Sequence, residues 1–136
     1  MQSSPIEKMN PTSSTARLSY KDLIVWQKSI EFASIVIDHA ENLASSRKHY
    51  RLMEQLEAAA TSIPMNIAEG KGRYSTKEYK HFLMIARGSL YETMTLLEIF
   101  QLKGWITTEA FQKLNNHALE IASMLTVLHR KLKPNQ

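Results

Sequence analysis

Residues 58–79 read AAATSIPMNIAEGKGRYSTKEY, and this stretch decides the fold. An alanine-rich helix carries Pro64, ends at the Gly70–Gly72 pair and gives way to a second helix at Ser75. Glycine commonly follows a helix end because it adopts the left-handed backbone that is needed there. Ser75 precedes Glu78 by three residues, the spacing of a capping box, in which the serine hydroxyl accepts a hydrogen bond from the Glu78 N–H. The stretch therefore predicts a tight corner between two long helices.

Apolar residues repeat at steps of three and four on both sides of this corner, which is the period of a helix that faces a core. Gly104 ends the helix that follows the corner, and Thr107 is placed to cap a further helix. Short polar connections between helices indicate antiparallel neighbours. We therefore predict an all-α protein, an antiparallel up-down-up-down four-helix bundle with helices at about 20–44, 50–70, 76–103 and 108–133.

The first helix is apolar over much of its circumference. Its predicted inward seam consists of Leu23, Trp26, Ile30, Ala33, Ile37, Ala40 and Ala44. A second apolar set lies off this seam and consists of Ile24, Phe32, Ile35, Val36 and Leu43. Because large exposed apolar patches mark interfaces, we interpret the second set as the contact surface of a homo-oligomer. The alternative is a wide core face within one chain.

The second and third helices are expected to pack closely, because the second is rich in alanine. Gly88 lies inside the third helix, where glycine costs about 1 kcal/mol relative to alanine, so we expect it to contact small residues of the second. Asn66 is expected to hydrogen-bond across the bundle, and Glu69 to pair with Arg73 or Arg87. The alternative interpretation is that Asn66 and Glu69 form a functional site at this end of the bundle. We interpret four residues as structural polar residues: Asn66, Glu69, Ser75 and Glu78.

Length and composition bound the class of protein. A chain of 136 residues fits one domain, which we place at 19–136, and residues 1–18 are rich in Ser, Thr and Pro and predict a disordered tail. The absence of cysteine excludes disulfides, thiolate catalysis and cysteine-bound zinc. No signal-peptide pattern is visible, and no apolar run approaches the roughly 20 residues of a membrane helix. We expect a soluble, cytoplasmic protein without a membrane partner.

Positive charge is concentrated near the corner. The formal net charge is +4, and residues 71–87 hold five basic side chains against one acidic one, so this segment accounts for the excess. In an up-down bundle, the start of the first helix, the corner and the end of the fourth helix share one end. We call this end the basic pole, and its predicted nucleic-acid-binding residues are Lys71, Arg73, Lys77, Lys80, Arg87, Arg130, Lys131 and Lys133.

Three aromatic or imidazole side chains accompany these cations: Tyr74, Tyr79 and His81. Lysine and arginine neutralise phosphates, while an exposed aromatic ring stacks on a base. The alternative is a solvated helix end with Tyr79 and Phe82 in the core. Both interpretations are open at this point.

Catalytic and metal-binding patterns are weak. Glu78 and His81 have the spacing of a di-metal ligand pair, but such a site needs a second pair and two further glutamates. The other candidate, His117 with Glu120, has the reverse order. The sequence holds no phosphate-binding glycine loop and no nucleophile elbow. We predict no metal, no cofactor and no enzymatic activity.

A family pattern is carried by SIPMNIAEG at 62–70 and by the residues around it. These are DLIVWQKS at 22–29, Arg73, Ser75, Tyr79, Phe82–Leu83, ARGSL at 86–90 and KGWI at 103–106. Over roughly 20–132 the chain resembles the bacterial four-helix bundle proteins encoded in intervening sequences of large-subunit ribosomal RNA genes. One departure is that Glu57 and Ala58 stand where members of that family commonly carry a basic pair.

The resemblance implies an up-down bundle assembled as a ring, a homopentamer, without enzymatic activity. It also implies kinship with accessory proteins of diversity-generating retroelements, which engage nucleic acid and a reverse transcriptase. We expect a non-enzymatic oligomeric bundle that binds RNA or DNA through the basic pole, with this protein itself and a nucleic-acid-handling protein as further partners. The alternative is a ring-shaped protein–protein scaffold without nucleic-acid binding.

Overall fold

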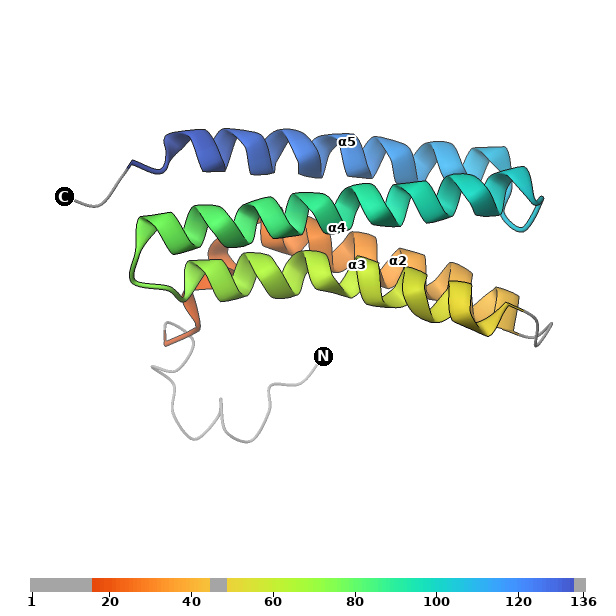
Figure 1. Cartoon of the computed structure of the whole chain (residues 1–136), viewed down its shortest axis with the longest axis horizontal. Helices are drawn as coiled ribbons and strands as arrows, with labels where there is room; N and C mark the ends of the chain where they lie inside the picture. Colours follow the sequence, from red (N-terminus) through yellow and green to blue (C-terminus); the bar gives the residue numbers. More distant parts are fainter. Residues whose placement is uncertain (1–15, 45–48, 134–136) are drawn as a thin grey trace.

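The protein is a bundle of four long helices (Figure 1). The computed structural model describes residues 16–44 and 49–133; residues 1–15 of the predicted tail lie outside this range. No strand occurs in the described ranges, so the predicted all-α bundle is confirmed. The elements in chain order are the 3-10 turn η2 (Ser19–Asp22) and the helices α2 (Ile24–Ala44), α3 (Tyr50–Lys71), α4 (Thr76–Leu102) and α5 (Thr108–Lys131).

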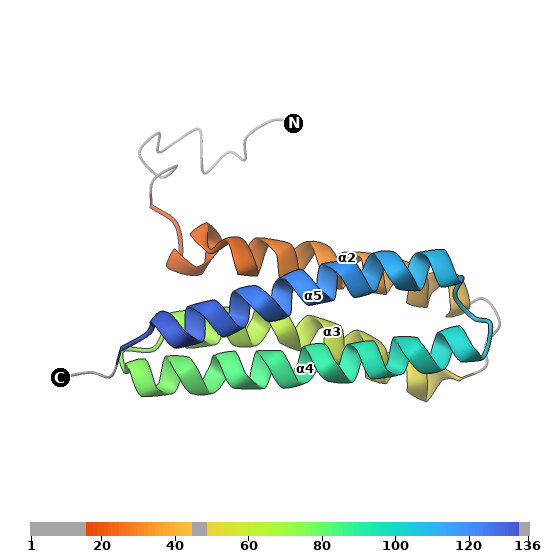
Figure 2. The same cartoon turned by 90° about the horizontal axis from the view of Figure 1, so that it is seen from above.

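The four helices run alternately up and down around a square. Each packs against its neighbours in sequence, and α5 closes the square by packing against α2. Viewed from above, α5 crosses the molecule between α2 and α4 (Figure 2). The contact between α3 and α4 is the most extensive, and those of α5 are looser. This order brings η2, the α3–α4 corner and the end of α5 to the same end of the bundle (Figure 1).

Side-chain caps begin α4 and α5, as the sequence predicts. Ser75 Oγ accepts from the Glu78 N–H at 3.3 Å, and Thr107 Oγ1 accepts from the Ala110 N–H at 3.0 Å. An N-cap of this kind satisfies a backbone donor that has no partner in the helix. The starts of both helices are therefore fixed locally by the sequence.

A Schellman motif ends α4. Gly104 has φ +75°, its N–H donates to the Gln101 carbonyl at 2.9 Å, and the Trp105 N–H donates to the Phe100 carbonyl at 2.9 Å. The Trp105 ring then packs edge-on against Phe100, with 5.0 Å between centroids. Such an apolar contact commonly accompanies the motif. Gly104 thus has the left-handed conformation that ends a helix.

The corner between α3 and α4 uses glycine differently, and our prediction there was wrong. Gly72 has φ −80°, in the right-handed region, and Gly70 is buried inside α3. A Cβ on Gly70 would lie 2.9 Å from Phe82 Cβ and 3.2 Å from the Tyr79 carbonyl oxygen. Gly70 is therefore needed because the start of α4 passes so close to α3 that no side chain fits between them.

The expected close contact at Gly88 is also wrong. A Cβ on Gly88 would meet no atom within 4 Å, and the residue is exposed. Its neighbour Ser89 makes the contact with α3 instead. Ser89 Oγ lies 2.8 Å from Ser62 Oγ of α3. Gly88 therefore lies on the outer face of α4, one position before the residue that contacts α3.

The hydroxyl pair of Ser62 and Ser89 belongs to a larger polar cluster between α3 and α4. Asn66 Nδ2 donates to Ser62 Oγ and to the Ser62 carbonyl, both at 2.8 Å. Buried Thr93 donates from Oγ1 to the Ser89 carbonyl at 2.7 Å. Hydrogen bonds satisfy these half-buried and buried polar groups, so the cluster is stabilising rather than costly. Both hydrogen bonds of Asn66 stay within α3, so the prediction that Asn66 bonds across the bundle was wrong; Ser62 makes the bond to α4.

The inward face of α2 differs from the predicted seam. The buried residues include a serine and run through the helix as Val25, Ser29, Phe32, Ala33, Val36 and Ala40. Ser29 is buried because its hydroxyl donates to the Trp26 carbonyl at 2.7 Å, so the polar group needs no water. Ile30, predicted to face inward, is 43% exposed. The apolar pattern did not establish which face of α2 points inward, because the hydrogen-bonded Ser29 occupies a core position.

Candidate nucleic-acid interface

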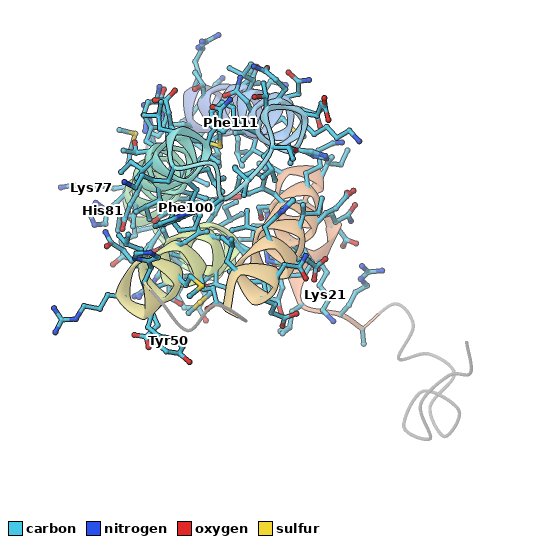
Figure 3. All side chains as sticks on the ribbon, turned by 90° about the vertical axis from the view of Figure 1, so that its right-hand side faces the viewer. Lys21, Tyr50, Lys77, His81, Phe100 and Phe111 are labelled. Atoms are coloured by element: carbon cyan, nitrogen blue, oxygen red, sulfur yellow. The ribbon has the colours of Figure 1, made fainter. Side chains whose placement is uncertain are left out.

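The basic pole is assembled from three segments that are distant in sequence. Figure 1 shows η2, the α3–α4 corner and the end of α5 together at one end of the bundle. Figure 3 looks along the bundle from the opposite end and shows Lys77 and His81 on the outer side of α4. Lys21 lies on the other side, near the start of α2. Lys77 and Lys21 thus lie on different sides of the bundle.

Arg73 is held in place at the corner. Its Nη2 atom lies 2.7 Å from Glu69 Oε1, and its guanidinium lies 4.9 Å from the centroid of the Phe82 ring. Glu69 thus pairs with Arg73, the first of its two predicted partners. Because the carboxylate offsets the charge of Arg73, this arginine contributes less to the field of the pole than a free cation does.

Lys71 and Lys77 lie on either side of the corner. Lys71 is half-buried at the end of α3, with Nζ 5.9 Å from the centroid of the Tyr79 ring. Lys77 is exposed in the first turn of α4. The α3–α4 turn therefore has one lysine before its apex and one after it.

The aromatic residues at the corner divide into buried and exposed. Tyr79 is buried, and its hydroxyl has no hydrogen-bond partner in the described part of the chain; burial raises the pKa of this phenol. Phe82 is half-buried against Arg73 and His81. Tyr74 is fully exposed. Of the tyrosines in the predicted site, only Tyr74 is thus placed to meet a ligand, while Tyr79 and Phe82 help to hold the helices together.

Lys80 joins α4 to the end of α5. Burial, and then the charge of Lys80, lower the pKa of His129. The lysine ammonium and the His129 imidazole are therefore close to each other across the α4–α5 contact. Beyond them, the end of α5 carries three exposed cations: Arg130, Lys131 and Lys133.

Arg87 does not belong with the other predicted cations. It lies ten residues after Lys77, about 15 Å along the helix. Its Nη2 atom donates to the Tyr91 hydroxyl at 2.7 Å, and its guanidinium lies 4.5 Å from the Tyr91 ring centroid. Tyr91 is one turn farther from the corner, so the Arg87 head group points away from the basic pole. From here on, the basic pole denotes the other seven predicted residues, which are Lys71, Arg73, Lys77, Lys80, Arg130, Lys131 and Lys133.

The predicted oligomer interface needs correction. Phe32 and Val36 are fully buried in the core of the single chain, so neither belongs to a surface. Ile35 and Leu43 are half-buried against the same core, and only Ile24, at 57%, is largely exposed. The helical phase of α2 explains the error, because Ser29 and not Ile30 faces inward.

Two apolar grooves lie on opposite sides of the bundle instead. The first, about 550 Å³, runs between α2 and α3, and Ile30 and the 66% exposed Met65 are at its rim. The second, about 270 Å³, runs between α4 and α5, with exposed Tyr91 and Leu119 among its lining residues. Met65 is part of the SIPMNIAEG segment, but because Pro64 precedes it, the sequence did not establish which face of the helix carries Met65.

The possible metal ligands are placed without a common centre. Glu78 and His81 are both exposed on α4, and Glu120 Oε1 accepts from Lys28 Nζ at 2.6 Å. No group of three or more His, Asp or Glu side chains suited to a metal ion occurs among the described residues. Within residues 16–44 and 49–133, none of the helices combines the length and apolar character that a membrane crossing requires.

The resemblance drawn from the sequence can be compared with known proteins. The chain matches the family described as 23S rRNA-intervening sequence protein over residues 21–127. It is similar to the crystal structure of a protein with unknown function from the S23 ribosomal protein family of Bacteroides thetaiotaomicron VPI-5482. The two are 29% identical, the match covers 79% of this chain and 100% of the other, and the TM-score is 0.75. No curated protein sequence matches the chain. Because the family match extends from the η2 turn far into α5, the chain belongs to the 23S rRNA-intervening sequence protein family.

Proposed function

We propose that this protein is a non-enzymatic, oligomeric helical bundle that binds RNA or DNA through its basic pole. The observation that carries the proposal is the gathering of cations from α3, α4 and α5 at one end of the bundle. Lysine and arginine side chains that replace condensed counterions supply most of the affinity in non-specific nucleic-acid binding. The chain shows no motif for reading base sequence, so binding depends on charge and not on sequence.

The cations of the basic pole that are available to contact phosphates lie mainly at its edges. Arg73 is paired with Glu69, and Arg17 Nε lies 3.5 Å from Asp22 Oδ1, so these charges are partly offset. Among the seven residues of the basic pole, the exposed cations without a carboxylate partner in the described part of the chain are Lys77, Arg130, Lys131 and Lys133. These four residues are therefore expected to contribute most of the phosphate contacts.

The two apolar grooves support self-association. A contact between the α2–α3 groove of one subunit and the α4–α5 groove of the next is heterologous, and such contacts close into rings when the rotation permits. The resemblance to ring-forming bundle proteins makes a homopentamer the proposed assembly. A ring presents several basic poles at once, and weak contacts at each pole then combine through avidity.

A salt titration tests the nucleic-acid proposal. Binding of a fluorescently labelled RNA is followed by anisotropy for the full chain and for the quadruple variant Lys77→Ala, Arg130→Ala, Lys131→Ala, Lys133→Ala. Binding through several phosphates weakens steeply with salt, and the variant should bind more weakly and with a shallower salt dependence. A control variant removes two exposed cations at the other end of the bundle, Arg51 at the start of α3 and Lys103 just after α4, and should bind as the wild type does.

Light scattering tests self-association separately. Replacing Ile30 and Met65 with lysine places charge in the α2–α3 groove and should produce monomers. Gln112→Lys adds one positive charge at an exposed position of α5 that lines neither groove, and should leave the assembly unchanged. A wild-type protein that is monomeric at micromolar concentrations would contradict this part of the proposal.

The apolar character of both grooves also favours a second candidate function. In this alternative the protein is a ring-shaped scaffold that recruits a protein partner and binds no nucleic acid. Binding of RNA and DNA that is absent, or unaffected by salt and by loss of the four cations, would favour the scaffold.

A further inference from the structure

The apex of the α3–α4 corner carries a side chain that the fold does not use. Tyr74 is fully exposed, and no hydrogen bond or ring contact holds it within the described part of the chain. By contrast, Tyr79 and Phe82 lie against the helices only a few residues away. A tyrosine at such a position exposes an apolar ring to water without a gain in folding stability.

The surroundings of Tyr74 favour a polyanion that has accessible aromatic faces. Lys71 lies three residues before it and Lys77 three residues after it, on the two helices that meet at the apex. Arg73 is held by Glu69 and Phe82, so it does not cover the neighbouring ring. A ligand at the apex therefore meets one exposed ring, with Lys71, whose Nζ lies near the Tyr79 ring, before it in the chain and exposed Lys77 after it.

We infer that this corner binds unpaired nucleotides in preference to duplex, with the Tyr74 ring stacking on a base and Lys71 and Lys77 contacting the adjoining phosphates. The inference rests on the proposed function and names its substrate class. Every base has a face on which an aromatic ring stacks, so the preference is for single strands and not for a sequence. In a duplex these faces are covered by neighbouring base pairs, and only the phosphates remain accessible.

The size of the effect follows from known stacking contributions. Removing an aromatic platform lowers affinity for a single strand by about 5- to 150-fold per stacked base. Loss of a lysine weakens binding to single strands and to duplexes alike in direction, because both carry phosphates. The effect of a substitution on the affinity for a single strand, compared with its effect on the affinity for a duplex, therefore separates stacking from charge.

The experiment compares Tyr74→Ala, Tyr74→Phe and the wild-type full chain by fluorescence anisotropy. The probes are a short unstructured RNA, the DNA of the same sequence, an abasic strand of equal length, and a hairpin duplex. Tyr74→Ala should lose affinity for both base-containing single strands by the stated factor and keep its affinity for the abasic strand and the duplex. Tyr74→Phe keeps the ring and should bind as the wild type does.

Two results would overturn the inference, and they differ in what they say about the proposed function. If Tyr74→Ala binds every probe as the wild type does while loss of the four pole cations weakens binding, the inference is wrong and the proposed function stands. If the wild type binds none of the probes, the proposed function fails, and this inference fails with it. Because the Tyr74 side chain is fully exposed and makes no hydrogen bond or ring contact within residues 16–44 and 49–133, circular dichroism should show the same unfolding temperature for all three proteins.

Discussion

A Cβ atom on Gly70 would lie 2.9 Å from the Cβ atom of Phe82, closer than side chains approach in folded proteins. The first two turns of α4 thus lie directly against the last turn of α3 at Gly70, with Tyr79 on the same side. Gly70→Ala should therefore destabilise the protein by about 1–3 kcal/mol, the range for overpacking a rigid site. Urea unfolding measures the loss. A stability equal to or above that of the wild type would mean that the helices separate freely at this corner.

Gly88 is the matched control for Gly70. It is exposed inside α4, and a Cβ there meets no atom within 4 Å. Alanine restricts the unfolded chain and favours the helix, so Gly88→Ala should raise the free energy of unfolding by about 0.5–1 kcal/mol. The two glycine substitutions thus have opposite predicted signs within one protein.

These two glycines show what sequence reasoning resolved and what it did not. The order, number and direction of the helices followed from apolar periodicity and from the caps at Ser75 and Thr107, which are local signals. The role of Gly70 depends on how closely two helices approach, which is a tertiary property. The phase of α2 was missed for a related reason, because a serine that bonds to its own helix can replace an apolar residue in the core.

Tyr79 provides a test of a buried, unpartnered group. Its hydroxyl is buried without a hydrogen-bond partner, so Tyr79→Phe should keep stability or increase it by about 1 kcal/mol. Tyr79→Ala, which also removes the ring, should cost about 3–5 kcal/mol. Burial raises the pKa of the phenol, so the folded state favours the neutral form. The wild type should therefore lose stability as pH rises above about 10, and Tyr79→Phe should lose less.

The hydroxyl pair between α3 and α4 should show energetic coupling. Ser62→Ala leaves Ser89 Oγ without the partner it has at 2.8 Å, and should cost about 1–3 kcal/mol. In a double-mutant cycle with Ser89→Ala, the double variant should cost less than the sum of the single variants, with a coupling of at least about 0.5 kcal/mol. If the losses in unfolding free energy of the two single variants add strictly, Ser62 and Ser89 do not interact energetically.

His129 should titrate at lower pH than an exposed histidine. Burial and the charge of Lys80 lower its pKa, so the value measured by NMR should lie below about 6.5. Because the unfolded chain binds this proton more tightly, the contribution of His129 to stability is present above pH 6.5 and is lost as pH falls below it. Lys80→Met should move the pKa upward only in part, since burial is the larger cause. His129→Gln should reduce the pH dependence of unfolding between pH 7 and 5.5 by the same contribution.

The candidate site was predictable as a set of cations and unpredictable in its details. The up-down topology alone places residues 71–80 and 130–133 at one end. Which cations are available depends on side-chain contacts that the sequence leaves open. Glu69 had two possible partners, and the Arg87 head group is drawn toward Tyr91 and away from the pole. The sequence likewise leaves open which aromatic residue at the corner is exposed. In the structure, Tyr79 and Phe82 pack against the helices and Tyr74 does not.

The alternating directions of the helices have an electrostatic consequence for the basic pole. α2 and α4 begin there, while α3 and α5 end there. A helix carries roughly half a positive charge at its amino end and half a negative charge at its carboxyl end, so the four macrodipoles nearly cancel. The field at this end therefore arises mainly from ionised side chains. It can be weakened stepwise, or reversed in sign, by surface substitutions that leave the backbone as it is.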